Sequence, residues 1–277
     1  MSVILEIRDG VPNWWNSPDI WVVPGSDPAG SPGQPIAGNP AYLWGRVRNN
    51  GDTQVNGVRV NFYWSNPATG VLRSNSTLIG SAFADLDAGE TQDVLCLTPW
   101  VPTVVNDGHE CVVAEAIHAS DPLPTPLPDA FDPPNLLQIA QRNLSVLAMK
   151  SSKMVMTVQI AVSEREKQAL EITAEIGEEL GREVLMQLGL EKIKFAKEPM
   201  GKIDLSLDRG CESEQKKGGC CDRIHLDVVG GVAQAVYLKV MPHKMRSGYY
   251  TPINVVARNR DQVVGGVTFV AVKSEEG

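Results

Sequence analysis

Five side chains in the last third of the chain are of the types that bind metal ions. Cys211, Cys220 and Cys221 lie close together, His225 follows them, and His243 stands further along. Structural zinc sites usually supply ligands as pairs separated by two to four residues. Here the spacing is C-x8-C-C, and adjacent cysteines chelate one ion poorly. We therefore interpret this segment as a surface loop with incidental thiols, and a zinc site or a local disulfide as its alternatives.

The patterns of common catalytic sites do not occur in the chain. His109-Glu110 lacks the second histidine of HExxH, and no G-x-S-x-G, Walker loop or strand-borne G-x-G-x-x-G is present. Cys111 lies two residues from His109 and seven from His118. On a strand these spacings do not bring a histidine base within hydrogen-bonding reach of the thiol. Asp85 and Asp87 offer only two carboxylates, fewer ligands than calcium requires. We expect a protein that is not an enzyme and that has no cofactor.

Trp14, Trp15 and Trp21 are the candidate interaction residues. Tryptophan is enriched at the energetic centres of protein interfaces, so an exposed cluster would serve as an anchor for a partner. Packing inside a domain is the alternative, and it is favoured for Trp21, as for Trp44 and Trp64. Trp14 and Trp15 are adjacent, so in an extended segment their side chains point to opposite faces.

Composition divides the 277 residues near Ala148–Ser151. All six Trp and sixteen of the nineteen Pro lie before residue 150, and no Lys precedes Lys150. Residues 1–149 contain six Arg and fifteen acidic residues, whereas residues 150–277 contain nineteen basic and eighteen acidic residues. This shift predicts two domains, residues 1–149 and residues 150–277, each long enough to bury its own core.

The same composition argues against several classes of function. The acidic first half lacks the clustered Lys and Arg that bind nucleic acid, and short lysine clusters in the second half are typical of a solvated face. No apolar run approaches the ~20 residues of a membrane span. Glu6 and Asp9 lie where a secretory signal has its basic region. We expect a protein that is cytoplasmic as synthesised or exported by a non-classical route.

Residues 40–64, PAYLWGRVRNNGDTQVNGVRVNFYW, contain two alternating runs, Ala41–Val47 and Val55–Trp64. The runs flank Asn49-Asn50-Gly51-Asp52, and Asn-Gly is the strongest short-range signal for a tight hairpin turn. In the second run Val58, Val60, Phe62 and Trp64 share one face. The pattern predicts an antiparallel hairpin with one face on the core of a β-sandwich.

Further patterns predict strands in both halves. In the first half they fall at residues 19–23, 78–84, 91–98, 111–118 and 140–147. Together with the two strands of the hairpin this gives about seven strands, as in an immunoglobulin-like sandwich. In the second half strands are expected at 154–162, 168–176, 202–207, 223–229, 233–240, 250–259 and 265–273, with a short helix near 178–188.

Two features of the first half have alternative interpretations. Residues 121–134 contain six prolines and are interpreted as a stiff loop between two strands, the alternative being a ligand for an aromatic groove. Cys96 and Cys111 lie in neighbouring predicted strands. We expect both to be buried as small hydrophobic side chains, with a disulfide as the alternative.

The first half resembles the CARDB-type immunoglobulin-like domains, the cell-adhesion-related domains of bacteria. The resemblance covers roughly residues 17–147 and depends on GRVRNNGDTQVNGVRVNFYW, LDAGET and ECVVAEAIHA, with SPDIWV before them and AQRNL after them. It implies a scaffold without a shared catalytic residue, and many such domains belong to exported proteins. The second half is loosely similar to a generic bacterial immunoglobulin-like module through PINVVARNRDQVVGGVTFVAV.

Together these features predict an all-β protein of two tandem immunoglobulin-like β-sandwiches, the second with a short helical insertion and a Cys-rich loop at residues 211–221. The predicted function is that of a non-enzymatic bacterial protein-protein interaction or structural subunit. Its partner would be another protein or a second copy of the chain, whereas carbohydrate binding has no support in the sequence. The alternatives are an accessory binding module for a separately encoded hydrolase, and a zinc-binding protein using the 211–225 cluster.

Overall fold

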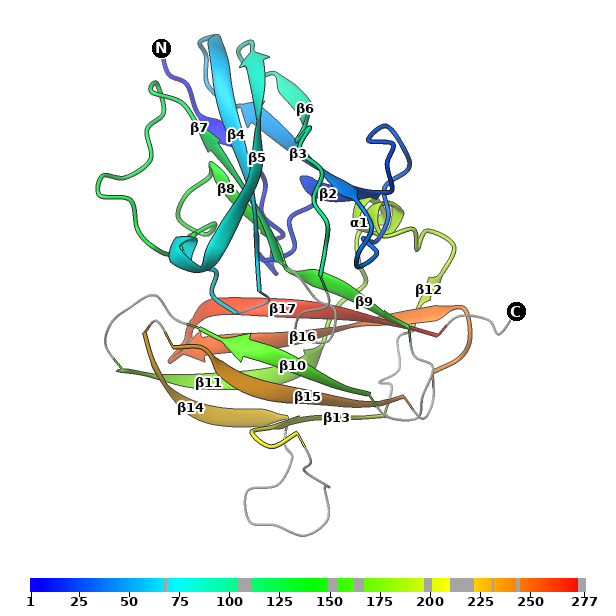
Figure 1. The fold of residues 1–277 in the computed structure, drawn as a ribbon. Coiled ribbons are helices and arrows are strands. Elements are labelled where there is room, and N and C mark those ends of the chain that lie inside the picture. The colour runs from blue at the N-terminus through cyan, green and yellow to red at the C-terminus, as the bar shows by residue number, and fades with distance from the viewer. Residues whose placement is uncertain are drawn as a thin grey trace. The chain divides into compact units, whose positions relative to one another are not determined.

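The computed structural model describes residues 1–66, 69–103, 111–148, 154–161, 167–196, 201–209, 222–230, 232–242 and 245–273. These residues form β-strands and a single α-helix, so the expected all-β class is confirmed. The chain divides into two compact units (Figure 1). Unit 1 comprises Met1–Asn66, Leu72–Asn143 and Glu183–Gly189, and unit 2 comprises Pro67–Val71, Leu144–Arg182 and Leu190–Gly277. Each unit thus contains a short segment from the other half of the sequence.

Unit 1 is a sandwich of two antiparallel sheets. In one, β3 (Ala41–Asn49) pairs with β1 (Leu5–Glu6), β2 (Ile20–Pro24) and β6 (Thr91–Leu95). The other has the order β5-β4-β7-β8, formed by β5 (Ser76–Leu86), β4 (Val55–Ser65), β7 (Cys111–Ile117) and β8 (Ile139–Arg142). The predicted alternation is observed, since Val58, Val60 and Phe62 are all buried in the core.

The predicted hairpin between β3 and β4 is wrong, because the two strands belong to different sheets and do not pair. A tight type I′ turn needs positive φ at both central residues, and neither Asn50 nor Gly51 has it. Instead the buried Asn49 side chain donates to the carbonyl oxygens of Thr53 and Asp87, which turns the chain toward the second sheet. Gly51 is required by a close approach, since a Cβ there would lie 2.1 Å from a backbone oxygen of the N-terminal segment.

The Pro-rich segment connects β7 to β8, as the loop interpretation predicted. Its backbone is held by Arg73, whose N–H donates to the Asp129 carbonyl at 2.7 Å and whose side chain donates to the Pro128 carbonyl at 3.1 Å. Phe131 is buried against Tyr63 of β4, with ring centroids 5.1 Å apart. The segment therefore covers part of the outer face of the β5-β4-β7-β8 sheet.

Unit 2 is a second sandwich. Its smaller sheet has the order β10-β15-β13, from β10 (Met154–Ile160), β15 (Gln234–Pro242) and β13 (Gly201–Ser206). Its larger sheet has the order β14-β11-β16-β17-β9, with β12 beside β16. Its strands are β14 (Arg223–Val229), β11 (Lys167–Ile176), β16 (Tyr249–Asn259), β17 (Gln262–Lys273), β9 (Leu144–Ala148) and β12 (Lys194–Phe195).

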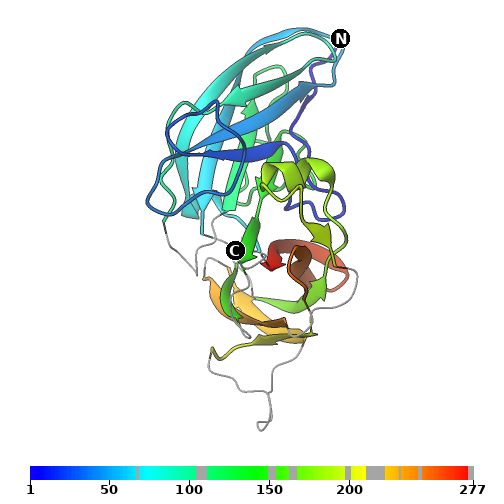
Figure 2. The same ribbon diagram turned by 90° about the vertical axis from the view of Figure 1, so that its right-hand side faces the viewer.

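Two expectations near the domain junction need correction. The strand predicted over residues 140–147 is two strands, β8 in unit 1 and β9 in unit 2, with Asn143 between them. The expected helix is α1 (Arg182–Gln187), and the turn that follows it contains Gly189 in the left-handed conformation, with φ +69°. Although it comes from the second half of the sequence, α1 belongs to unit 1, where it lies beside β2 (Figure 2).

Candidate functional site

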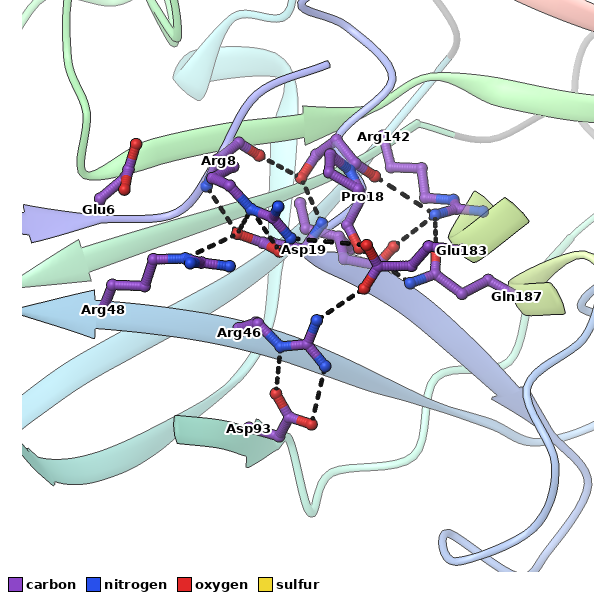
Figure 3. Close-up of polar contacts among 12 residues, drawn as sticks. Glu6, Arg8, Pro18, Asp19, Arg46, Arg48, Asp93, Arg142, Glu183 and Gln187 are labelled. Carbon is purple, nitrogen blue, oxygen red and sulfur yellow. Dashed lines mark hydrogen bonds and ion pairs between the residues drawn. The ribbon is translucent and has the colours of Figure 1, made fainter. Parts of the chain in front are cut away.

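The most extensive group of charged contacts in unit 1 centres on Asp19, whose side chain is fully buried (Figure 3). Its carboxylate accepts hydrogen bonds from the Arg8 backbone N–H at 3.0 Å and from the Arg8 guanidinium at 2.5 to 3.1 Å. The Ser17 hydroxyl donates to the Arg8 carbonyl at 2.6 Å and accepts from the Asp19 N–H at 3.0 Å. These bonds fix the N-terminal segment to the start of β2. The hydrogen bond to Asp19 raises the pKa of Arg8.

Arg46 of β3 connects this centre to α1. It donates to both carboxylate oxygens of Asp93, at 2.7 and 3.1 Å, and to Glu183 at 2.6 Å. These hydrogen bonds, first with Asp93 and then with Glu183, raise the Arg46 pKa. Its guanidinium also lies 5.5 Å from the ring centroid of Trp21, within cation–π range. The alternation of β3 places Arg46 on the face opposite the core.

Arg142 of β8 holds the other end of the helix. It is buried, and its guanidinium donates to the carbonyl oxygen of Ile20 at 2.7 Å and to the side-chain oxygen of Gln187 at 2.5 Å. Burial lowers the pKa of Arg142 to about 10. The Gln187 amide in turn donates to the Pro18 carbonyl at 2.8 Å. Glu183 and Gln187 are four residues apart, so one face of α1 makes both contacts.

This Arg–carboxylate network positions elements and does not resemble a reaction centre. Asp19, Asp93 and Glu183 are each engaged by an arginine, and guanidinium groups keep their proton at neutral pH and cannot act as acids or bases. Its chemistry is that of charge-assisted hydrogen bonds, which fix the N-terminal segment and α1 on β3.

A second feature of unit 1 is the free side of β5. In the part of the chain that the structure describes, β5 pairs only with β4. Its exposed face presents Leu78, 51% exposed, and Phe83, 67% exposed. The strand STLIGSAFADL contains one charged residue, Asp85, and no proline. Its pairing with β4 is irregular between Gly80 and Leu78 and again between Ala84 and Leu86, so the register is regular over Gly80–Ala84.

The other outer strands of unit 1 are protected in ways that natural sheets use against unwanted pairing. β8 has only four residues and is bridged by Asn16. β2 follows Pro18 and ends at Pro24, and β6 is a five-residue strand that contains Asp93. β5 is longer, nearly uncharged and free of proline, so it is the strand of unit 1 best suited to intermolecular pairing.

The structure places the three candidate tryptophans mainly inside unit 1. Trp15 and Trp21 are buried, and Trp21 stacks on Trp44 with ring centroids 6.0 Å apart. Trp14 is half-buried and meets Trp15 edge to face at 5.7 Å. Only Trp14 therefore offers part of its ring to solvent, and a role of these residues in partner binding stays a prediction.

Other predicted candidates are placed as follows. Cys96 and Cys111 are free thiols and buried, as the packing interpretation expected, and burial raises the pKa of both. One carboxylate oxygen of Asp85 accepts the Gly57 N–H at 2.7 Å. Cys211, Cys220, Cys221 and His243 lie outside the described residues, and His225 of β14 is 77% exposed.

Sequence reasoning did not select the residues of the Arg–carboxylate network or Phe83. Asp19 and Glu183 are far apart in sequence, so no local spacing relates them. A partial signal was present in β3, where Arg46 and Arg48 occupy alternate positions on the face opposite the buried one. Phe83 alternates with the buried Ala82 and Ala84, so its position indicated an exposed aromatic side chain.

Comparisons with known proteins give no family assignment. No family model and no curated protein matches the chain. A solved structure of red sea bream transglutaminase is 11% identical over 93% of this chain and 32% of its own, with a TM-score of 0.22. Calcium-binding domains CBD12 of CALX1.2 and CALX1.1 are 8% and 9% identical, cover 80% and 78% of this chain and 76% and 74% of theirs, and have TM-scores of 0.21 and 0.18.

These similarities carry no argument about activity. The chain spans about a third of the length of the transglutaminase that it matches. Within the described part of the chain, no helix is long and apolar enough to cross a membrane.

Proposed function

We propose that this chain is a non-enzymatic binding or assembly subunit, built on immunoglobulin-like sandwiches, that associates with protein through the β5 edge of unit 1. The observation that carries the proposal is the long, nearly uncharged β5, which among the described residues pairs on one side only and exposes Phe83 within its regular run. An extended segment of a partner can add to such an edge through backbone hydrogen bonds, while an aromatic side chain supplies buried apolar area.

The Arg–carboxylate network also supports this proposal, because its groups serve to position elements. Its buried and charged groups are engaged with one another and connect β2, β3, β6, β8 and α1, which is the role of a scaffold. The CARDB-type resemblance, which likewise implies a scaffold, adds to it. The zinc-binding alternative depends on cysteines outside the described residues, and no observation on the described ones favours it or a hydrolase accessory role.

Photo-cross-linking in cells that express the chain tests the proposal. A photoreactive amino acid replaces Phe83 in one variant and Ile36, which is also exposed, in the control. We expect a discrete cross-linked protein adduct from position 83, whether of this chain or another, and none of the same mass from position 36. Absence of any adduct at position 83 would contradict a role for this edge in protein binding.

A further inference from the structure

We propose that the occupant of the β5 edge is a second copy of the same chain, paired antiparallel through Gly80–Leu86 about a two-fold axis at Phe83. This inference rests on the proposed function and specifies its partner. The two β5-β4-β7-β8 sheets would then continue into one another across the interface. Closed two-fold dimers are the commonest soluble oligomers, and they require a surface that is complementary to itself.

The length and regularity of the β5 edge permit such pairing. Residues Gly80 to Ala84 keep an unbroken register with Phe62 to Val58 of β4, so this stretch of β5 has the regular strand geometry that pairing with another strand requires. The bulge at Ile79 ends the regular register at one end. At the other end the register shifts between Val58 and Val55 of β4, opposite Ala84 and Leu86, and the turn after Leu86 ends the strand. The available edge is therefore a defined segment, which limits the registers that a second copy could adopt.

The sequence of this segment is compatible with itself. With the axis at Phe83, each Phe83 ring lies beside the ring of the other copy, and cross-strand aromatic pairs stabilise sheets. Each Ser81 hydroxyl then lies opposite the Asp85 carboxylate of the second copy. The two Asp85 charges are kept four residues apart, about 13 Å along the strand. On the core side the small side chains of Ala82 and Ala84 face one another without a clash.

The charge pattern disfavours a register centred on Asp85. An axis at Asp85 would set the two carboxylates directly opposite each other, and like charges at that position destabilise a sheet. No other charged residue lies in β5. The charge pattern therefore excludes the register centred on Asp85, and we propose the register centred on the exposed aromatic side chain, Phe83.

The first experiment measures the mass of the full chain by sedimentation over a concentration series. We expect a reversible monomer–dimer equilibrium. Phe83→Arg should raise its dissociation constant by at least about tenfold, because it removes a central aromatic side chain and places two guanidinium groups at the axis. Ile36→Arg adds the same charge at another exposed apolar position of unit 1 and should leave the constant unchanged.

A second experiment tests the register directly by disulfide formation, in a chain whose Cys211, Cys220 and Cys221 are changed to serine. Residues directly opposite in a sheet are close enough for a disulfide. Phe83→Cys should therefore form a covalent dimer by itself. Ser81→Cys and Asp85→Cys should form one when mixed, and neither should do so alone.

A wild-type chain that is monomeric throughout, or a dimer that Phe83→Arg leaves intact, would overturn this inference. Equal cross-linking of Ser81→Cys alone and in the mixture would overturn it as well. If the chain is monomeric while position 83 cross-links in cells to a different protein, the second copy is excluded and the proposed binding function stands. If position 83 forms no adduct at all, both fail.

Discussion

Asp19 shows how unit 1 accommodates a charge away from water. A buried carboxylate is costly unless its lone pairs are filled, and Arg8 alone supplies three of the donor groups that surround it. Such a pair adds little net stability compared with apolar residues of the same size, but removing one partner is strongly destabilising. Its value here is positional, because it aligns the N-terminal segment with β2.

Asp9, which follows Arg8 in the chain, is in a less favourable environment for a charged carboxylate. Burial raises its pKa above the ordinary value, and the nearby Glu6 raises it further. A raised carboxyl pKa lets the folded state keep a proton that the unfolded state has released, so stability falls as the pH rises through the unfolded pKa toward the folded one. Above this window, ionised Asp9 lowers the free energy of unfolding by an amount that no longer changes with pH.

We therefore expect Asp9→Asn to stabilise the protein at pH 7, by less than about 1 kcal/mol because the side chain is only half-buried. Near pH 2.5, about one unit below the unfolded pKa, variant and wild type should have the same stability. Urea unfolding at both pH values measures the difference. The control is Asp87→Asn at an exposed turn, and a stability gain that persists unchanged at the low pH would argue against the ionisation of Asp9 as its cause.

At the scale of elements, α1 depends on its contacts rather than on its own propensity. A helix of six residues does not form alone in water, so the position of α1 is determined by the arginines that hold Glu183 and Gln187. Gln187 is central, because it satisfies the buried Arg142 guanidinium and the Pro18 carbonyl together.

Gln187→Ala should therefore loosen α1 selectively. It leaves a buried charged donor without one acceptor, a defect of about 1 to 3 kcal/mol. Hydrogen exchange of the amides in residues 184–189 should accelerate, since the free energy of local opening falls by that amount. Met186→Ala truncates an exposed side chain on the same helix and serves as the control. Equal exchange rates in the two variants would show that Gln187 does not hold the helix.

Strands were predictable from the sequence because alternation indicates burial of one face, and β3 follows this pattern along its whole length. β17 was recognisable instead as a run of apolar, β-branched residues, and it is buried at eight consecutive positions. Their connections were not equally predictable. Asn50-Gly51 has the composition of a hairpin turn, yet the contacts of the buried Asn49 side chain direct the chain to the other sheet. β1 and β12 are two residues each, too short for any period to appear.

At the scale of the whole molecule, the chain order and the folded units do not coincide. The compositional break predicted one junction near residue 149, whereas Glu183–Gly189 belongs to unit 1 and Pro67–Val71 to unit 2. Composition changes along the chain show where neighbouring residues differ in type. They do not show that a segment packs in the folded state against residues that are distant in sequence. The Arg–carboxylate network was missed for the same reason, because Arg46 and Glu183 meet only in the folded state.

The position of β9 makes this difference measurable. Leu144–Ala148 pairs in parallel with Thr268–Val272 of β17, and it would be lost from a fragment that begins at the compositional boundary. A fragment of residues 144–277 should therefore be more stable than one of residues 150–277. At about one hydrogen bond per strand residue and about 0.5 to 1 kcal/mol per bond, the five residues predict a difference of about 2.5 to 5 kcal/mol. Urea unfolding followed by circular dichroism measures it. Without β9 the apolar β17 also presents an unpaired edge, so the shorter fragment should aggregate more readily. Equal unfolding midpoints would mean that β9 contributes nothing to unit 2 and that the boundary read from composition is the physical one.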